Sequence, residues 1–143
     1  MTNLLSKINA LKPGEFLSLT PKGFSMCPTF LGGRDQVYVT APDFPLSKGD
    51  IAIFLRKDDT YVIHRVCKVK SQNEYYFLGD NQTKIEGPIF EEQIHGIVTH
   101  IVKKGKVIDC NKNFSYKLYS KLWLFFRPLR PFFRFCFNTF RKL

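Results

Sequence analysis

The chain has 143 residues, of which 44% are hydrophobic and 24% charged, and its formal net charge is +10. This composition predicts a folded protein with one core, and it excludes a disordered chain and a second full domain. The charge is uneven, because residues 114–143 contain seven Lys and Arg and no acid, whereas residues 1–113 carry about +3. A basic tail of this kind is typical of contact with anionic lipid or nucleic acid, or of a solvated face.

The chain begins with a predicted helix and continues with predicted strands. Residues 3–11 place leucines and an isoleucine at helical spacing and end in Lys-Pro-Gly, which predicts a short amphipathic helix. Val-, Ile-, Phe- and Tyr-rich segments follow, separated by Gly, Pro, Asp and Asn, at residues 15–20, 35–41, 50–56, 61–69, 74–79 and 93–109. Short strands at this spacing predict a mainly β, antiparallel, barrel-like domain.

The last predicted element is a second helix. Residues 114–126 put large apolar side chains near one helical face and lysines on another, before a proline-containing segment ends the pattern. The chain therefore divides into a β domain, residues 1–110, and an amphipathic helical tail, residues 111–143. We expect residues 114–143 to contact an anionic membrane surface, with packing on the β domain or a docked partner as alternatives, and no nucleic-acid ligand.

Targeting and metal-binding signals are missing from the sequence. The N-terminal segment is too short and too polar for a secretory signal, and no run approaches the ~20 apolar residues that span a bilayer. Cys27, Cys67, Cys110 and Cys136 lack zinc-type or disulfide-framework spacing, so we expect free thiols, no metal and no cofactor. The expected location is the cytoplasm or, as a peripheral protein, a membrane surface.

Three side chains are candidates for nucleophilic chemistry. Ser25 lies in a Gly-Phe-Ser-Met-Cys-Pro segment, and a serine hydroxyl needs a positioned base to become a nucleophile. His64 lies in the middle of the predicted strand at 61–69, which would hold its ring in place. Asp80 follows the next strand in a Gly-Asp-Asn turn, where its carboxylate could orient an imidazole. Each residue alone also fits a bland interpretation: a turn serine, a hydrogen-bonded strand histidine and a turn aspartate.

Four short segments, read in order, resemble a known family. GFSMCP, LSKGDIAIF, YVIHRVCKV and FLGDNQTKIE look like the Ser-Met-x-Pro, Gly-Asp, His-Arg-Val and Gly-Asp-Asn boxes of the signal peptidase I-like serine peptidases, over roughly residues 16–109. His64 resembles the base of the archaeal and endoplasmic-reticulum branch, where histidine stands in place of lysine. The resemblance implies a signal-peptidase/LexA-like β fold and a serine endopeptidase that cleaves signal or leader peptides.

The resemblance also implies a role for each site residue. It assigns the nucleophile to Ser25, the general base to His64 and the orienting acid to Asp80. Glu86 stands where the histidine branch often carries a second aspartate, so it is an accessory candidate. The implied substrate is a peptide or a preprotein. The rate of cleavage should decrease as the pH falls through about 6–7, because His64 becomes protonated there.

Residues around the nucleophile are expected to position it. Gly23 would let the chain turn before Ser25, and Met26 would anchor the turn in the core or line the substrate site. Some lysine-type relatives carry a hydroxyl at the position of Gly23 that donates to the oxyanion hole; with that donor missing, the Ser25 N–H would serve alone. Arg65 and Lys48 are expected at the solvated surface.

Two further functions stay open from the sequence. Members of the resembled family are normally tethered by a transmembrane helix, for which this sequence shows no candidate. That difference and the missing donor at position 23 also fit a non-catalytic peptide-binding or membrane-recruiting module on the same scaffold. A self-cleaving, DNA-bound repressor is disfavoured, because residues 1–13 are too few for a helix-turn-helix domain and such proteins usually have lysine in place of His64.

Overall fold

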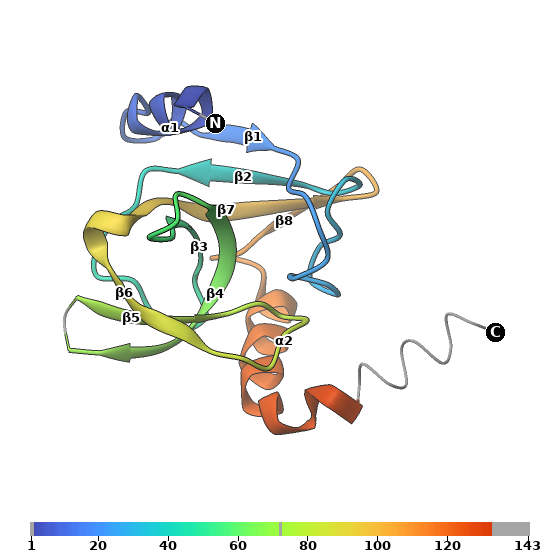
Figure 1. Ribbon diagram of the computed structural model, residues 1–143. Helices are drawn as coiled ribbons and strands as arrows, with labels where there is room; N and C mark the ends of the chain where they lie inside the picture. Colours follow the sequence, from blue (N-terminus) through green and yellow to red (C-terminus); the bar gives the residue numbers. More distant parts are fainter. Residues whose placement is uncertain (1, 72, 133–143) are drawn as a thin grey trace.

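The computed structural model describes residues 2–71 and 73–132 as one antiparallel sheet with a helix at either end (Figure 1). The N-terminal helix α1, Thr2–Asn9, confirms the predicted first helix. It buries Ile8, which is 1% exposed, among the side chains of the sheet. Burial of one such aliphatic side chain stabilises the fold by about 1.5–3 kcal/mol, which fixes this short helix in place.

Eight strands form the sheet, and every pairing between them is antiparallel. The strands are β1 Leu17–Leu19, β2 Gln36–Thr40, β3 Ile51–Leu55, β4 Tyr61–Lys70, β5 Glu74–Leu78, β6 Glu86–Phe90, β7 Ile94–Lys103 and β8 Lys106–Asp109. Their order is β1-β2-β7-β3-β4-β5-β6, with β8 paired to β7. The mainly β, antiparallel prediction is confirmed. Within the described chain this order is an open path from β1 to β6, so the barrel-like closure is not confirmed.

Two strands differ from the predicted elements. The expected strand at 93–109 is the hairpin of β7 and β8, because Lys104 (φ 51°) and Gly105 (φ 78°) form a tight turn between them. The sequence analysis missed β6, since Gly87 and Pro88 lie inside it and interrupt the hydrophobic pattern. Proline is tolerated there because β6 lies at the end of the strand order.

The sheet separates two clusters of buried side chains. Along β3, Ile51 and Ile53 belong to the first cluster, while Ala52 and Phe54 belong to the second. Successive residues of a strand point to opposite faces, so the alternation places one cluster on each side of β3. Both faces of the central strands are therefore buried.

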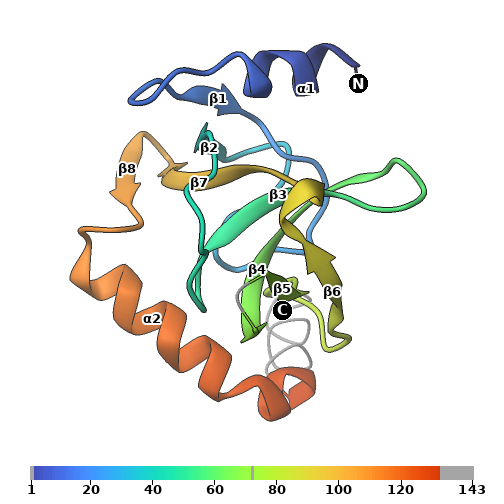
Figure 2. The same cartoon turned by 90° about the vertical axis from the view of Figure 1, so that its left-hand side faces the viewer.

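The C-terminal part contains the helix α2, Phe114–Phe125, and a short 3-10 helix η2, Arg127–Leu129. The helix begins where the sequence predicts, because the Asn113 side chain accepts a hydrogen bond from the Tyr116 N–H at 2.9 Å. Figure 2 shows α1 and α2 at opposite ends of the molecule. The rest of the predicted tail, residues 133–143, lies outside the described residues. Within the described chain, no helix has the length and apolar character needed to cross a membrane.

Candidate active site

Ser25 lies on a compact turn that is fixed on both sides. Before it, Gly23 adopts φ +84° and its carbonyl accepts a hydrogen bond from the Gly32 N–H at 3.0 Å. After it, Met26 is 3% exposed and packs in the first cluster, which anchors the turn in the core. Ser25 itself is half-buried. The turn thus holds the serine at the edge of the core.

His64 lies in the middle of β4, opposite Ala52 of β3. Its ring packs against Phe54 at a centroid distance of 6.1 Å, so it points to the face of the second cluster, and the residue is 2% exposed. The ring nitrogen Nδ1 is buried and has no hydrogen-bond partner among the described residues. A buried imidazole with an unsatisfied nitrogen is costly in a fold, and such a group calls for an explanation.

Gly79 connects the segment of Ser25 to His64. Arg65 pairs with Leu78 at the end of β5, and the same register continued by one residue would set Gly79 opposite His64. Side chains of directly opposed residues lie roughly 5 Å apart on the same face. A Cβ on Gly79 would lie 2.6 Å from the Ser25 carbonyl oxygen. The Ser25 carbonyl oxygen therefore lies directly over Gly79, one residue beyond the last pair of β4 and β5.

Replacing Gly79 with alanine is expected to displace the Ser25 turn. The new methyl group would meet the Ser25 carbonyl oxygen at 2.6 Å, and that oxygen is held at 2.8 Å by the Asn81 N–H. Overpacking of this kind costs about 1–3 kcal/mol, which chemical denaturation would measure as a lower midpoint. The exposed neighbour Thr83, changed to alanine, is the control and should stay within about 0.5 kcal/mol of the parent. Equal stability of the two variants would contradict the close approach.

Asp80 lies in a buried ion pair with Arg65, and both residues are fully buried. Its Oδ1 accepts from Arg65 Nε and its Oδ2 from Arg65 Nη2, each at 2.8 Å, and the Thr29 hydroxyl also donates to Oδ2. The expectation that Arg65 is solvated is therefore wrong. The reason is the carboxylate, which offsets the cost of burying a guanidinium.

The position of Asp80 bears on its expected role. Arg65 follows His64 in β4, so the two side chains leave opposite faces of the strand, and Asp80 lies on the side of Arg65. No hydrogen bond joins Asp80 to His64 within the described part of the chain. The assignment of Asp80 as the acid that orients His64 stays a prediction. The structure does show that Asp80 holds the loop that contacts Ser25.

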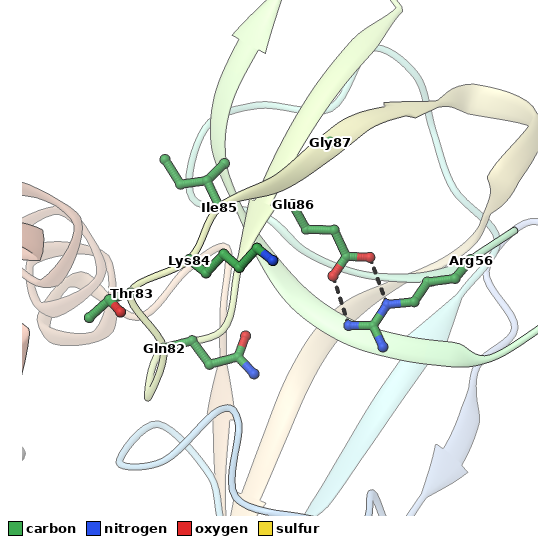
Figure 3. A pocket seen from close by; sticks show the side chains of 7 residues that line it. All are labelled: Arg56, Gln82, Thr83, Lys84, Ile85, Glu86 and Gly87. Carbon is green, nitrogen blue, oxygen red and sulfur yellow. Dashed lines mark hydrogen bonds and ion pairs between the residues drawn. The ribbon is translucent and has the colours of Figure 1, made fainter. Parts of the chain in front are cut away.

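Glu86 is the acid on the face of His64. It lies opposite Phe77, a member of the second cluster, and accepts from Arg56 Nε and Nη2 at 2.7 Å each (Figure 3). Burial lowers the pKa of His64 to about 4; the charge of Glu86 opposes this, that of Arg56 adds to it, and Asp80 has a smaller raising effect. The ion pair of Glu86 and Arg56 thus sets the local charge around the imidazole.

An open groove of about 620 Å³ runs beside this ion pair. Figure 3 shows the pair on one side, with Gln82 and Lys84 across from it. The full lining is Arg56, Gln82, Thr83, Lys84, Ile85, Glu86 and Gly87. Since β6 ends the strand order, the groove lies along an edge to which an extended peptide could add as a further strand.

Several residues around the site were missed by sequence reasoning. Thr29 bonds to Asp80, and the Tyr119 hydroxyl lies 2.8 Å from the Thr29 hydroxyl, although the two residues are 90 positions apart. Arg130 donates from Nη1 to the carbonyls of Gly79 and Gln82, at 2.9 and 3.0 Å. Nothing in the local pattern marks these residues, because each acts through a partner remote in sequence.

Comparison with known proteins yields no match: no family model fits the sequence, and no curated protein or solved structure is significantly similar to it. The three described cysteines, Cys27, Cys67 and Cys110, are free thiols. The interpretation of the site therefore depends on its residues and geometry.

Proposed function

We propose that this chain is a serine endopeptidase in which Ser25 is the nucleophile and His64 the general base. The observation that supports it most is the packing of the Ser25 carbonyl over Gly79, which directly follows Leu78, the strand partner of Arg65 next to His64. The proposed substrate is a signal or leader peptide, as the resemblance of the four boxes implies. We also propose that the open sheet is a barrel-like domain of the signal-peptidase/LexA type.

The proposed reaction uses the neutral imidazole. His64 accepts the Ser25 Oγ proton while Oγ attacks the peptide carbonyl, and it then gives that proton to the departing amine. In deacylation His64 takes a proton from the water that attacks the acyl carbonyl, and it gives that proton to Ser25 Oγ as the acyl–oxygen bond breaks. Burial keeps the His64 pKa at about 4, so the ring stays unprotonated at neutral pH. Glu86 stabilises the imidazolium that forms, and Asp80 positions the loop.

The test is covalent labelling of the full chain with a fluorophosphonate, with the adduct mapped by mass spectrometry. An activated serine reacts much faster than the other hydroxyls of the chain. We expect one adduct, on Ser25. Labelling that is absent from folded protein, also with a second acylating probe, would overturn the proposal.

The labelling rate should fall at acid pH as His64 becomes protonated, and we call this part of the pH profile the acid limb. We expect Arg56→Gln and Glu86→Gln to shift the acid limb in opposite directions. Burial of His64 moves this limb from the pH 6–7 expected from sequence to about pH 4. Loss of Arg56 leaves Glu86 unpaired beside the ring, raises the His64 pKa and moves the limb to higher pH. Loss of Glu86 does the reverse. Since both groups are partly exposed, each shift should be roughly 0.5–1 pH unit. Shifts in the same direction would contradict the arrangement.

A second function has an observation of its own. Neither the Ser25 hydroxyl nor His64 Nδ1 makes a hydrogen bond within the described chain, which fits a peptide-binding module without turnover. Such a module would bind a leader peptide equally well after Ser25→Ala, and it would show neither labelling nor cleavage. Both functions expect binding to survive Ser25→Ala, so the two are separated by labelling and peptide cleavage with the parent chain, which the peptidase shows and the binding module does not.

A further inference from the structure

The helix α2 turns its apolar face away from the sheet. Phe114 and Phe125 are 77% and 75% exposed, and Leu118 and Leu122 are 47% and 46% exposed. At 100° per residue these four side chains form one stripe along the helix. Beyond the helix, Leu129 of η2 is 49% exposed. The described part of the chain thus exposes five large apolar side chains on α2 and η2. We call these five residues the outer face.

The opposite side of α2 is polar and aromatic, and it is this side that contacts the protein. Ser120 and Tyr116 meet the buried guanidinium of Arg65, and Trp123 donates from Nε1 to the Asp80 carbonyl at 2.9 Å. The helix is held on the domain by these polar contacts. Its orientation is therefore fixed with the outer face toward solvent.

Positive charge lies along one flank of the outer face and near its two ends. Lys117 and Lys121 are exposed along one flank of the stripe, and Lys112 and Arg127 are exposed near its two ends. Residues 110–132 contain no acid. An apolar stripe with lysines along one flank complements the headgroup region of an anionic bilayer, in which apolar side chains enter the acyl boundary and lysines meet lipid phosphates.

We propose that the outer face of α2 and η2 binds the surface of an anionic bilayer, with the helix parallel to the membrane plane. This inference does not depend on the peptidase function. The side of α2 away from the membrane would then carry the loop of Asp80, so that the candidate site lies about one helix diameter, roughly 10 Å, above the lipid.

The test is cosedimentation of the full chain with large unilamellar vesicles. One set is phosphatidylcholine alone, and the other also contains about 30% phosphatidylglycerol, which gives a negative surface potential. We expect binding to the anionic vesicles only, weakened by salt. The double variants Leu118→Ser/Leu122→Ser and Lys117→Gln/Lys121→Gln should each lower partitioning at least about tenfold. Val107→Ser, which alters an apolar side chain of β8 that is 52% exposed, is the matched control and should bind as the parent does. Circular dichroism confirms that each variant is folded.

Three outcomes would overturn the proposal. Parent-like binding by both folded double variants would place the lipid contact elsewhere in the chain. Equal binding to neutral and anionic vesicles would remove the role of the lysines. Absence of vesicle binding would overturn it directly; if sedimentation then showed a dimer that Leu118→Ser/Leu122→Ser dissociates, the outer face would be an interface between two copies of this chain.

Discussion

Replacing His64 with glutamine is expected to lower the rate of Ser25 labelling and of peptide cleavage at least ~10³-fold at pH 7. Glutamine keeps a polar side chain of similar volume but cannot take the hydroxyl proton. Ser25→Ala should remove the adduct and the cleavage altogether. The acid Glu86 and the groove stay in place in both variants, so peptide binding should survive while turnover is lost.

A control for the His64 variant comes from the same sheet. His95 lies in β7, contacts the ring of Tyr61 and takes no part in the site. His95→Gln should therefore cleave and label as the parent does. Thermal unfolding of both glutamine variants separates a chemical effect from a loss of folding. Full activity in a folded His64→Gln variant would exclude His64 as the base.

Replacing Asp80 with asparagine is expected to destabilise the fold by about 3–5 kcal/mol, the usual cost of leaving one member of a buried ion pair without its partner. Both residues of the pair are fully buried. Arg65 also donates to the Gly49 carbonyl at 3.0 Å, which holds its guanidinium inside the protein, so the unpaired charge cannot move to the surface and become hydrated. Urea unfolding would measure the loss as a lower midpoint. The loop that touches Ser25 should loosen with it.

The exposed acid Asp43 supplies the control, since Asp43→Asn should change stability by less than about 0.5 kcal/mol. A double variant sharpens the test. Arg65→Met with Asp80→Leu removes both charges, so it should lose less stability than Asp80→Asn alone. If Asp80→Asn unfolded at the same urea concentration as the parent, the buried pair would not hold the loop.

The sequence predicts most of the elements, since each has a local pattern. The missed strand β6 shows the limit: Gly87 and Pro88 are read as a break, and only pairing with β5 makes them part of an edge strand. Arg65 shows another limit. Its burial depends on a carboxylate 15 positions downstream, which no local pattern contains.

The orientation of α2 could not be predicted from its periodicity. The sequence marks an apolar face and a lysine flank correctly, and the usual rule would turn the apolar face inward. Here the domain offers a buried guanidinium and loop carbonyls to the helix, and Tyr116, Ser120 and Trp123 satisfy these groups better than leucine could. The polar groups that the β domain presents to α2 therefore determine which side of the helix faces inward.

Sequence alone does not say how the candidate site residues lie relative to one another. Ser25 and His64 come from segments whose own patterns and family resemblance mark them. Glu86 was ranked below Asp80, because spacing along the chain does not say which strand face a carboxylate occupies. Register supplies that information: Glu86 lies opposite Phe77, on the face of His64.

The contact between Thr29 and Tyr119 has a consequence for biosynthesis. Because the Thr29 hydroxyl donates its proton to Asp80, Tyr119 is the donor in their shared hydrogen bond. The ribosome adds Tyr119 90 residues after Thr29. Until α2 has emerged from the exit tunnel, the Asp80 loop lacks the contacts from Tyr119, Trp123 and Arg130 that hold it. The Asp80 loop therefore gains its full set of supporting contacts only late in synthesis, after α2 has folded onto the completed sheet.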